Sequence, residues 1–550
     1  MKIKGRVLII CCLVVVAVVC CILVISGLGG NTSKKPETKE FTIFIAEPGQ
    51  PTTPDNKIMK LIKEELGVTL KMEFLVGDLD QKIGVMIAGG DYPDVVTGHT
   101  RFINAGVLIP LEDLIEKHAP NLYEHHKPYW EMCKDPEDGH IYFMPNYGRY
   151  YGEYRATDFW GPCFWLQKAV LAEFGYPKIK TLDEYFDLIK RYKEKYPEIN
   201  GMPTIGFEIL SYGWRNFCLK NPPQHLIGHP NDGGVVVDQE TFKAEIFADK
   251  EYAKRYYKKL NEMNALGLID RETFTLNYDQ YIAKLSSGRV LGMFDQKWNF
   301  NNANNSLIMQ DMVERTYAPC PVTYDESIRD WYMDRTVLNL NNGFGITKNC
   351  KDPVGFLKFL DALLTEKWQK ILGWGIEGED YHVDENGVFY RTPEQRERST
   401  DLTWKLANMA EKLWSFAPKM EGTYSDGNAC TPGYQPGEFF ESLKPYEQDF
   451  LRKYGYQTWA DFYSPPPPNP VYYPAWQINL VDGSPAKIAE QKMNDLAMKY
   501  LPMAIMAKPE EFDAIWDEYV TEMHKLDIKA YEDRINEQIQ WRLANWGGRE

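Results

Sequence analysis

Short apolar segments alternate with amphipathic ones after residue 40. FTIFI at 41–45 is almost wholly apolar and VTLKMEFLV at 68–76 alternates strictly, and both patterns are typical of strands. Between them, residues 57–66 repeat apolar side chains at helical spacing, and residues 79–88 do the same before a third apolar run at 94–96. This order of strand, helix, strand, helix, strand predicts a parallel sheet with right-handed connections.

Polar residues follow two of these strands. Glu47 comes just after the first predicted strand, and His99 and Arg101 come just after the third. Open parallel sheets bind their ligands at the carboxyl ends of the strands. We therefore expect these three side chains at a ligand-binding edge of the sheet.

A second group of helices and strands follows the first sheet. Thr181 and Glu184 form a capping box for one helix, and another helix is predicted over 250–267. RVLGMF at 289–294 is typical of a buried strand, and one continuous helix is predicted over 353–372. A chain of 550 residues exceeds the roughly 250 to 300 residues that one core supports, so two lobes are expected.

Composition narrows the class of protein. Hydrophobic residues make up 44% and charged residues 25%, which excludes a wholly disordered chain and a polytopic membrane protein. After the first 33 residues, 59 basic side chains stand against 78 acidic ones, a net charge of −19, so nucleic acid is not an expected partner. The aromatic content of 14% suits a protein that stacks rings on apolar ligand faces.

The amino terminus carries a membrane signal. Lys2, Lys4 and Arg6 precede an uncharged apolar run over 7–30 that is long enough to span a bilayer. Because the cations stay in the cytoplasm, the rest of the chain is expected outside the cell. No cysteine of the run lies in a good lipobox, so residues 1–30 are either a transmembrane anchor, which we favour, or a cleaved signal peptide. Residues 31–40 are predicted to form a flexible tether.

Motifs for metal binding or catalysis are weak. The cysteine spacings after the apolar run fit no zinc site, and they are compatible with up to three disulfides or with free thiols. GWGIEG at 373–378 matches a dinucleotide pattern, but it ends a predicted helix instead of joining a strand to a helix. We therefore expect no catalytic residue, no cofactor and no metal. The cysteines concerned are Cys133, Cys163, Cys218, Cys320, Cys350 and Cys430.

Several strings, taken in order, indicate a family. The chain resembles the family 1 extracellular solute-binding proteins of ABC importers, in particular their LplA-like lipoprotein branch, from about residue 41 to about 535. The strings are IAGGDYPDVV, VLIPLEDLIEKHAPNL, ALGLID, SGRVLGMF, GITKNCKDPVGFLKFLDALL and GWGIEGEDYHVDENG.

The resemblance implies an α/β, two-lobed fold of the periplasmic-binding-protein type (type 2, Venus flytrap) with several crossovers between the lobes. On this basis we expect residues 41–158 and about 320–372 in the first lobe. The second lobe is expected to comprise about 159–319 and 373–550.

The resemblance also implies a function. Such a protein binds a saccharide, most often an oligosaccharide, in the cleft, without catalysis and as a monomer. It then delivers the sugar to ABC permease subunits, whose partner ATPase drives import. Some relatives carry a calcium loop after the helix that ends here near Tyr196, but PEINGMP lacks the carboxylates for one, so calcium is not expected there.

The resemblance further suggests ligand-binding residues. Similar sugar-binding proteins place a stacking tryptophan where this chain has Trp298, and another cleft aromatic where it has Trp214. Beside Trp298, Asp295 and Asn299 are candidates for hydrogen bonds to hydroxyls, although an ordinary polar loop has the same composition.

Two further candidates lie in the aromatic segment 146–165, which is expected to cross between the lobes. We choose Tyr151 and Trp160, although core packing also explains aromatic rings there. Two other functions stay open for the whole chain. One is a surface carbohydrate-active enzyme, such as a glycoside hydrolase or lyase, and the other is a ligand sensor without transport.

Overall fold

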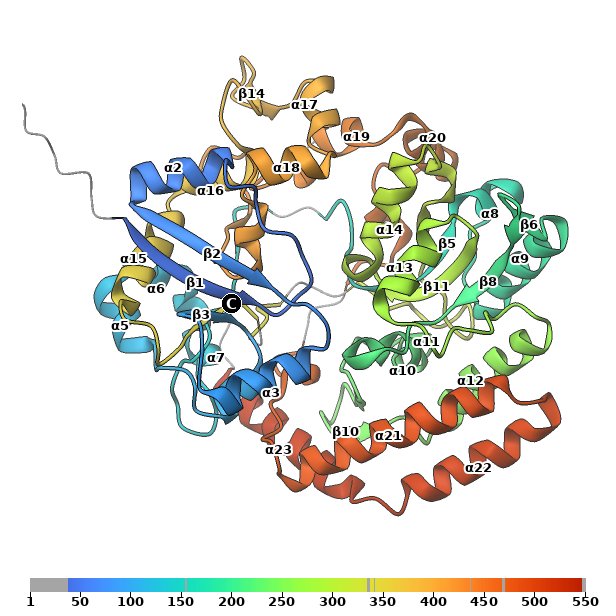
Figure 1. Cartoon of the computed structure of the whole chain (residues 1–550). Helices are drawn as coiled ribbons and strands as arrows, with labels where there is room; N and C mark the ends of the chain where they lie inside the picture. Colours follow the sequence, from blue (N-terminus) through green and yellow to red (C-terminus); the bar gives the residue numbers. More distant parts are fainter. Residues whose placement is uncertain are drawn as a thin grey trace, which may run out of the picture.

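The computed structural model describes residues 38–153, 156–333, 337–340, 342–435, 437–466 and 470–546. It forms two lobes that lie side by side (Figure 1). The apolar run predicted as an anchor lies outside the described residues. The predicted tether over 31–40 is too long, because strand β1 already begins at Lys39. Within the described ranges, no helix is long and apolar enough to cross a membrane.

The first lobe is built on a four-stranded sheet in the order β13, β3, β1, β2. β2 (Val68–Phe74) and β3 (Val95–Thr97) both run parallel to β1 (Lys39–Ile45), which confirms the predicted parallel arrangement. β13 (Phe344–Ile346) joins antiparallel beside β3, so the sheet is completed by a segment far along the chain.

Neighbouring residues determine where the first connecting helix, α2 (Lys57–Leu66), begins and ends. The side chain of Asn56 accepts a hydrogen bond from the backbone N–H of Met59, which satisfies a donor that the helix leaves free. Gly67 ends the helix with a φ of 66°, which costs glycine little because it has no Cβ. The other helices of this lobe are α3 (Leu79–Gly89), α4 (Thr100–Asn104), α5 (Glu112–His118), α6 (Pro120–His126), α7 (Trp130–Cys133), α15 (Pro353–Leu363) and α16 (Glu366–Trp374).

The helix predicted over 353–372 is two helices, so this prediction is wrong in part. α15 ends at Leu363 and α16 begins at Glu366. Thr365 stands between them with extended backbone angles (φ −69°, ψ 146°), which interrupts the helical hydrogen bonds although the apolar pattern continues.

The second lobe has its own four-stranded sheet, in the order β12, β5, β11, β8. β11 (Val290–Gln296) runs parallel to β8 (Ile205–Glu208) and antiparallel to β5 (Pro162–Gln167), and β12 (Tyr317–Cys320) forms the other edge. Helices α8 (Lys168–Glu173), α9 (Leu182–Lys195), α10 (Phe217–Lys220), α11 (Pro222–Leu226), α12 (Glu251–Ala265), α13 (Tyr278–Ser286) and α14 (Lys297–Met309) surround it. α9 begins with the predicted capping box of Thr181 and Glu184.

Three long helices close the lower side of the second lobe in Figure 1. α21 (Pro485–Met506) lies against α12, α22 (Phe512–Met523) and α23 (Ile528–Asn545). The remaining elements are β4 (Tyr150–Tyr151), β6 (Glu198–Ile199), β7 (Met202–Pro203), β9 (Val235–Val237), β10 (Ala244–Ile246), β14 (His382–Val383), β15 (Phe389–Tyr390), β16 (Glu421–Gly422), α17 (Pro393–Arg398), α18 (Leu402–Asn408), α19 (Glu438–Ser442) and α20 (Pro445–Tyr454).

Each lobe has its own main hydrophobic core. One core gathers residues between 41 and 144, between 338 and 372 and between 410 and 417, and the other gathers 163–333 and 439–539. The chain thus passes between the two cores three times. Two lobe boundaries differ from the expected ones. The chain stays in the second lobe up to residue 333, because β12 belongs to the second sheet. Residues 410–417 belong to the first lobe, where Phe416 packs on Phe356.

Candidate ligand-binding cleft

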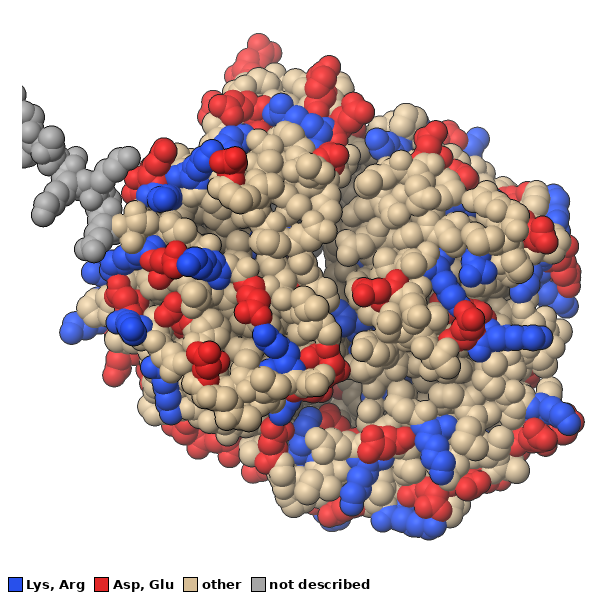
Figure 2. Space-filling view, in the orientation of Figure 1, with Lys and Arg blue, Asp and Glu red and all other residues tan. Residues whose placement is uncertain are grey.

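A cavity of about 890 Å³ lies between the lobes. The first lobe and the crossing segments contribute Glu47, Tyr147, Asn339, Asn342 and Lys419 to its walls, and the second lobe contributes the rest. Figure 2 shows the surface hollowed where the two lobes meet. Both lobes therefore touch anything that is bound in the cleft.

Tryptophan rings dominate the second lobe's wall. Trp160, Trp214, Trp298 and Trp476 are 43%, 45%, 39% and 39% exposed, and all four line the cavity. They are the exposed tryptophans of the described residues. Large apolar rings are normally buried, so four open rings around one cavity indicate a binding surface.

Two of these rings form a stacked aromatic pair at the surface of the cleft. The rings of Trp214 and Trp298 are stacked at a centroid distance of 5.8 Å with 10° between their planes. The indole N–H of Trp298 donates to Oε1 of Gln296 at 2.7 Å, which fixes the ring's rotation. The guanidinium of Arg215 lies 4.4 Å from the centroid of the Trp214 ring, a cation–π contact that holds the second ring.

A buried polar network lies under this surface. Nε of Arg215 donates to Oδ1 of Asn299 at 2.8 Å, and Nδ2 of Asn299 donates to Oδ1 of Asp295 at 3.0 Å. The hydroxyl of Tyr281 also donates to Asp295, at 2.8 Å. Burial raises the pKa of Asp295 to about 6, and these hydrogen bonds oppose the shift. Asp295 and Asn299 therefore lie beneath the cleft and hold Arg215, and neither lines the cavity.

Glu47 is the predicted strand-end residue that does line the cavity. It follows β1 directly, as the sequence pattern indicates. Removal from water between the lobes raises the pKa of Glu47, while the positive charges of Arg215 and Lys412 lower it. Since Arg215 belongs to the second lobe, the Glu47 carboxylate is within electrostatic reach of the opposite wall.

His99, Arg101 and Tyr151 are not among the residues that line the cavity. His99 caps α4 by accepting the backbone N–H of Arg101 at 3.3 Å, and burial lowers its pKa. Arg101 donates to the backbone oxygen of Asp80 at 2.8 Å, and its Nε lies 3.7 Å from a carboxylate oxygen of Asp482. The Tyr151 hydroxyl lies 2.8 Å from Nδ1 of His125.

Most of the polar side chains in the cavity wall are not among the residues predicted from the sequence. Four asparagines, one lysine and one glutamate line the cavity around α10 and α21, a region called here the deep end of the cleft. Trp476 lines the cavity from another segment. No local motif marks them, because they come together only when α21 packs against α12. The polar residues are Asn216, Lys220, Asn221, Asn231, Glu490 and Asn494.

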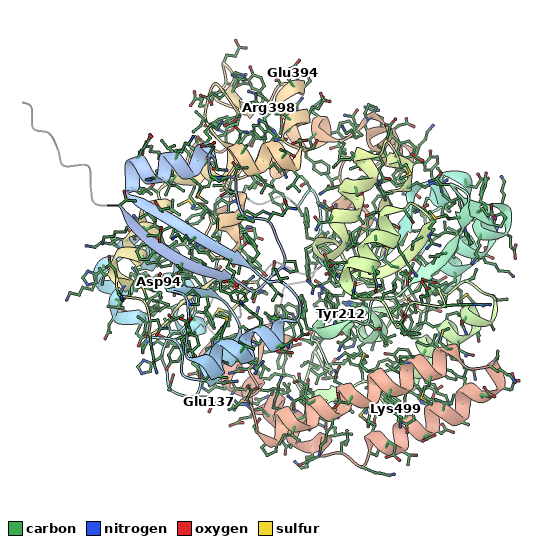
Figure 3. The ribbon with its side chains drawn as sticks, viewed as in Figure 1. Asp94, Glu137, Tyr212, Glu394, Arg398 and Lys499 are labelled. Carbon is green, nitrogen blue, oxygen red and sulfur yellow. The ribbon has the colours of Figure 1, made fainter. Side chains whose placement is uncertain are left out.

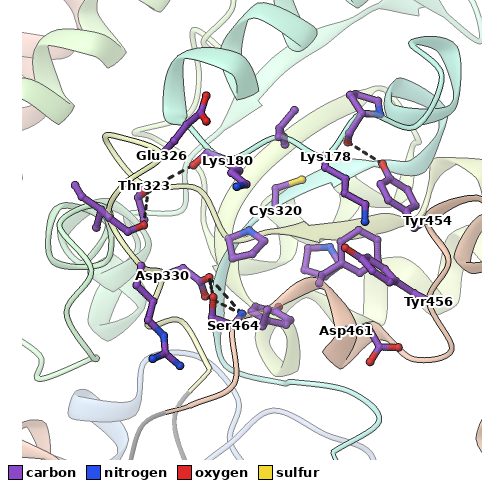
Figure 4. Close-up of a pocket in the computed structure, with 18 of the residues that line it drawn as sticks. Lys178, Lys180, Cys320, Thr323, Glu326, Asp330, Tyr454, Tyr456, Asp461 and Ser464 are labelled. Carbon is purple, nitrogen blue, oxygen red and sulfur yellow. Dashed lines mark hydrogen bonds between the residues drawn. The ribbon is translucent and has the colours of Figure 1, made fainter.

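A second cavity, of about 570 Å³, lies within the second lobe (Figure 4). Its walls come from segments 171–180, 319–330 and 454–465. The backbone N–H of Ser464 donates to Asp330 at 3.2 Å, and the Tyr454 hydroxyl donates to the backbone oxygen of Pro177 at 3.2 Å. No tryptophan and no residue of the first lobe lines this cavity, so the cleft is the better candidate.

Comparison with known proteins identifies the family. A family model for bacterial extracellular solute-binding proteins matches residues 49–370, which is more than half of the chain. The chain belongs to this family. The two-lobed α/β fold of solute-binding proteins, expected from the sequence, is confirmed.

Individual relatives agree with this assignment. The fructooligosaccharide ABC transporter substrate-binding protein FusA of Streptococcus pneumoniae is 27% identical over 374 residues, which cover 64% of this chain and 66% of that relative. The alignment thus spans slightly less than two thirds of FusA. The lipoprotein LipO of Bacillus subtilis is 24% identical over 381 residues, 65% of this chain and 71% of LipO. The structure of S. pneumoniae FusA in complex with kestose superposes with a TM-score of 0.63 at 20% identity, covering 92% of this chain and 100% of that one.

Proposed function

We propose that the protein is the extracellular substrate-binding component of an ABC importer and that it binds an oligosaccharide between its lobes. The observation that carries the proposal is the set of four exposed tryptophans on one cavity wall, with asparagine side chains beside them. Sugar rings present apolar C–H faces to aromatic rings and hydroxyl groups to amides, so they need both kinds of residue. The name of FusA, a fructooligosaccharide-binding relative, supports the same class of ligand.

The proposed role is binding without catalysis. Glu47 and Glu490 are the carboxylates that line the cavity, and they belong to opposite lobes. The carboxylate of Glu490 forms an ion pair with Lys487 at 2.7 Å, so it is already engaged with a side chain of the protein. FusA is named as a substrate-binding protein, which supports the same proposal.

The partners follow from the same role. We propose that the loaded protein, as a monomer, presents its two lobes to ABC permease subunits in the membrane, whose ATPase drives import. The apolar run at residues 7–30 is proposed to keep the protein at the outer face of the membrane. The family description, extracellular solute-binding protein, supports an outside location.

The test is a binding screen with a check for turnover. The full chain, kept in solution with detergent, is heated with a panel of neutral and acidic mono- and oligosaccharides that includes kestose. Ligand at 100 times its Kd adds about 2.7 kcal/mol of stability, enough to raise the melting temperature visibly. We expect at least one oligosaccharide to stabilise the protein and to be recovered intact by chromatography. A cleaved sugar would show an enzyme, and no stabilisation by any sugar would contradict carbohydrate binding.

A further inference from the structure

The deep end of the cleft lies where α10 meets α21. Lys220, the last residue of α10, and Asn494 of α21 both line the cavity there. The ammonium group of Lys220 donates to Oδ1 of Asn494 at 2.7 Å, and Nδ2 of Asn216 donates to the same oxygen at 2.8 Å. One amide oxygen thus serves two donors.

The positive charge of Lys220 has no direct counter-charge. No ion pair joins Lys220 to a carboxylate of the part of the chain that the structure describes. Glu490 lies one helical turn before Asn494, but its carboxylate pairs with Lys487 at 2.7 Å. Burial lowers the pKa of Lys220 to about 8, and the charge of Glu490 opposes this only in part. A buried ammonium without an anion costs free energy, which a ligand that brings an anion would offset.

The amides around Lys220 strengthen this preference. Nδ2 of Asn221 donates to Oδ1 of Asn231 at 3.1 Å, so the side-chain oxygens of both Asn231 and Asn494 are already occupied by protein donors. Within the described part of the chain, the side-chain N–H groups of Asn231 and Asn494 donate to no protein atom, so this wall offers free donors to a ligand. Oxygen atoms of an anionic group accept such hydrogen bonds well.

We infer that the deep end of the cleft recognises an anionic group, a carboxylate or a sulfate, on the bound saccharide, and that Lys220 determines this specificity. This inference rests on the proposed function, because it names the class of sugar that the same cleft takes. The stacked tryptophans hold the apolar faces of the sugar rings, and Lys220 selects the acidic substituent.

Recognition of an anion by Lys220 couples ligand binding to the uptake of protons. An anion beside Lys220 raises the pKa of the ammonium, so binding near pH 8 takes up roughly half a proton per ligand. The charged group that lines this part of the cavity beside Lys220 is Glu490, which forms an ion pair with Lys487 at 2.7 Å. The tyrosines from α12, α22 and α23 have raised pKa values and stay neutral in this range; they are Tyr257, Tyr519 and Tyr531.

The experiment compares charged and uncharged forms of one sugar. Binding to the full chain is measured by calorimetry with oligogalacturonides, oligoglucuronides and sulfated oligosaccharides, each beside its methyl-esterified or unsulfated counterpart, and with kestose as a neutral sugar. We expect at least one acidic form to bind ten times or more tightly than its neutral counterpart. Between pH 7 and pH 9 its affinity should fall several-fold, while that of the neutral form stays constant.

Three variants locate the effect. Lys220→Met should abolish the preference for the acidic form. Lys220→Arg should keep the preference and lose the pH dependence, because arginine stays charged throughout, and this variant also serves if Lys220→Met does not fold. Lys492→Met, which replaces an exposed lysine of α21, should change neither.

The outcomes separate the two proposals. Equal binding of acidic and neutral sugars, with no effect of Lys220→Met, would overturn the role of Lys220 and leave oligosaccharide binding intact. Failure of every sugar, kestose and the other neutral forms included, would overturn the proposed function and this inference together.

Discussion

The indole rings of Trp214 and Trp298 lie parallel, 5.8 Å apart between centroids, although the two residues are 84 positions apart in the chain. Topology explains the contact. β8 and β11 are parallel neighbours, with Phe207 opposite Gly292, and each tryptophan follows the carboxyl end of its strand. Two strand ends at one edge of a sheet thereby build a single aromatic surface that faces the cleft.

Trp298→Ala should weaken sugar binding roughly thirtyfold, which corresponds to about 2 kcal/mol. The substitution removes one aromatic ring from the cavity wall, where the ring is 39% exposed and open to a ligand. Calorimetric titration with a sugar found in the screen measures the change. Tyr212→Ala is the matched control, since Tyr212 is 42% exposed, lies two residues before Trp214 and does not line the cavity (Figure 3). Equal effects of both variants would contradict the stacking role.

Asp295→Asn should lower both stability and sugar affinity. The carboxylate accepts hydrogen bonds from Tyr281, Asn299, Cys218 and the backbone N–H of Gln296. In the Asp295→Asn variant, the NH₂ group that replaces one carboxylate oxygen is itself a donor and cannot accept these hydrogen bonds. We expect a loss of about 1 to 3 kcal/mol in the free energy of unfolding. Binding should weaken as well, because the network no longer holds Arg215 under Trp214.

Urea unfolding and calorimetric titration of Asp295→Asn test this account together. Loss of stability with full retention of sugar affinity would show that the network supports the core alone and does not position the ring.

Glu208 should make stability depend on pH. This carboxyl group is buried at the end of β8, and burial, followed by the neighbouring Asp270, raises its pKa from 4.5 to about 8. Between these values the folded protein keeps a proton that the unfolded chain has lost, so stability falls as pH rises. The slope contributed by Glu208 is at most about 1.4 kcal/mol per pH unit.

The free energy of unfolding, measured in urea from pH 5 to pH 8, reports this slope. Glu208→Gln, which cannot ionise, should have a flatter profile than the natural protein. Parallel profiles for the two proteins would contradict a raised pKa at Glu208.

Sequence patterns predicted those parts of the fold that depend on neighbouring residues. The helix over 57–66, the strand that begins at Val68 and the capping box at Thr181 all have local causes, and the structure has each of them. The break at Thr365 was not predicted, because the apolar period continues through it.

In the candidate site, too, sequence patterns do not predict contacts between residues that are far apart in the chain. Trp298 lines the cavity, but Asp295 near the end of β11 and Asn299 in the first turn of α14 are both buried. Lys220 and Asn494 meet only through the packing of α21, so no local pattern could join them. The role of all these residues in binding stays a prediction.

Gly233→Ala should weaken sugar binding through Trp476. Gly233 has a φ of 77°, and a Cβ atom there would lie 2.9 Å from Cβ of Trp476, closer than real Cβ contacts. Alanine costs roughly 1 to 2 kcal/mol in this left-handed conformation, and it must also push Trp476 from its place in the cavity wall. Gly267→Ala is the matched control, because Gly267 has a φ of 69° and no atom within 4 Å of an added Cβ. Gly233→Ala should therefore lose at least as much stability as Gly267→Ala in thermal unfolding, and Gly233→Ala alone should lose sugar affinity in calorimetric titration. Equal affinities for the two variants would mean that Trp476 does not contact the ligand.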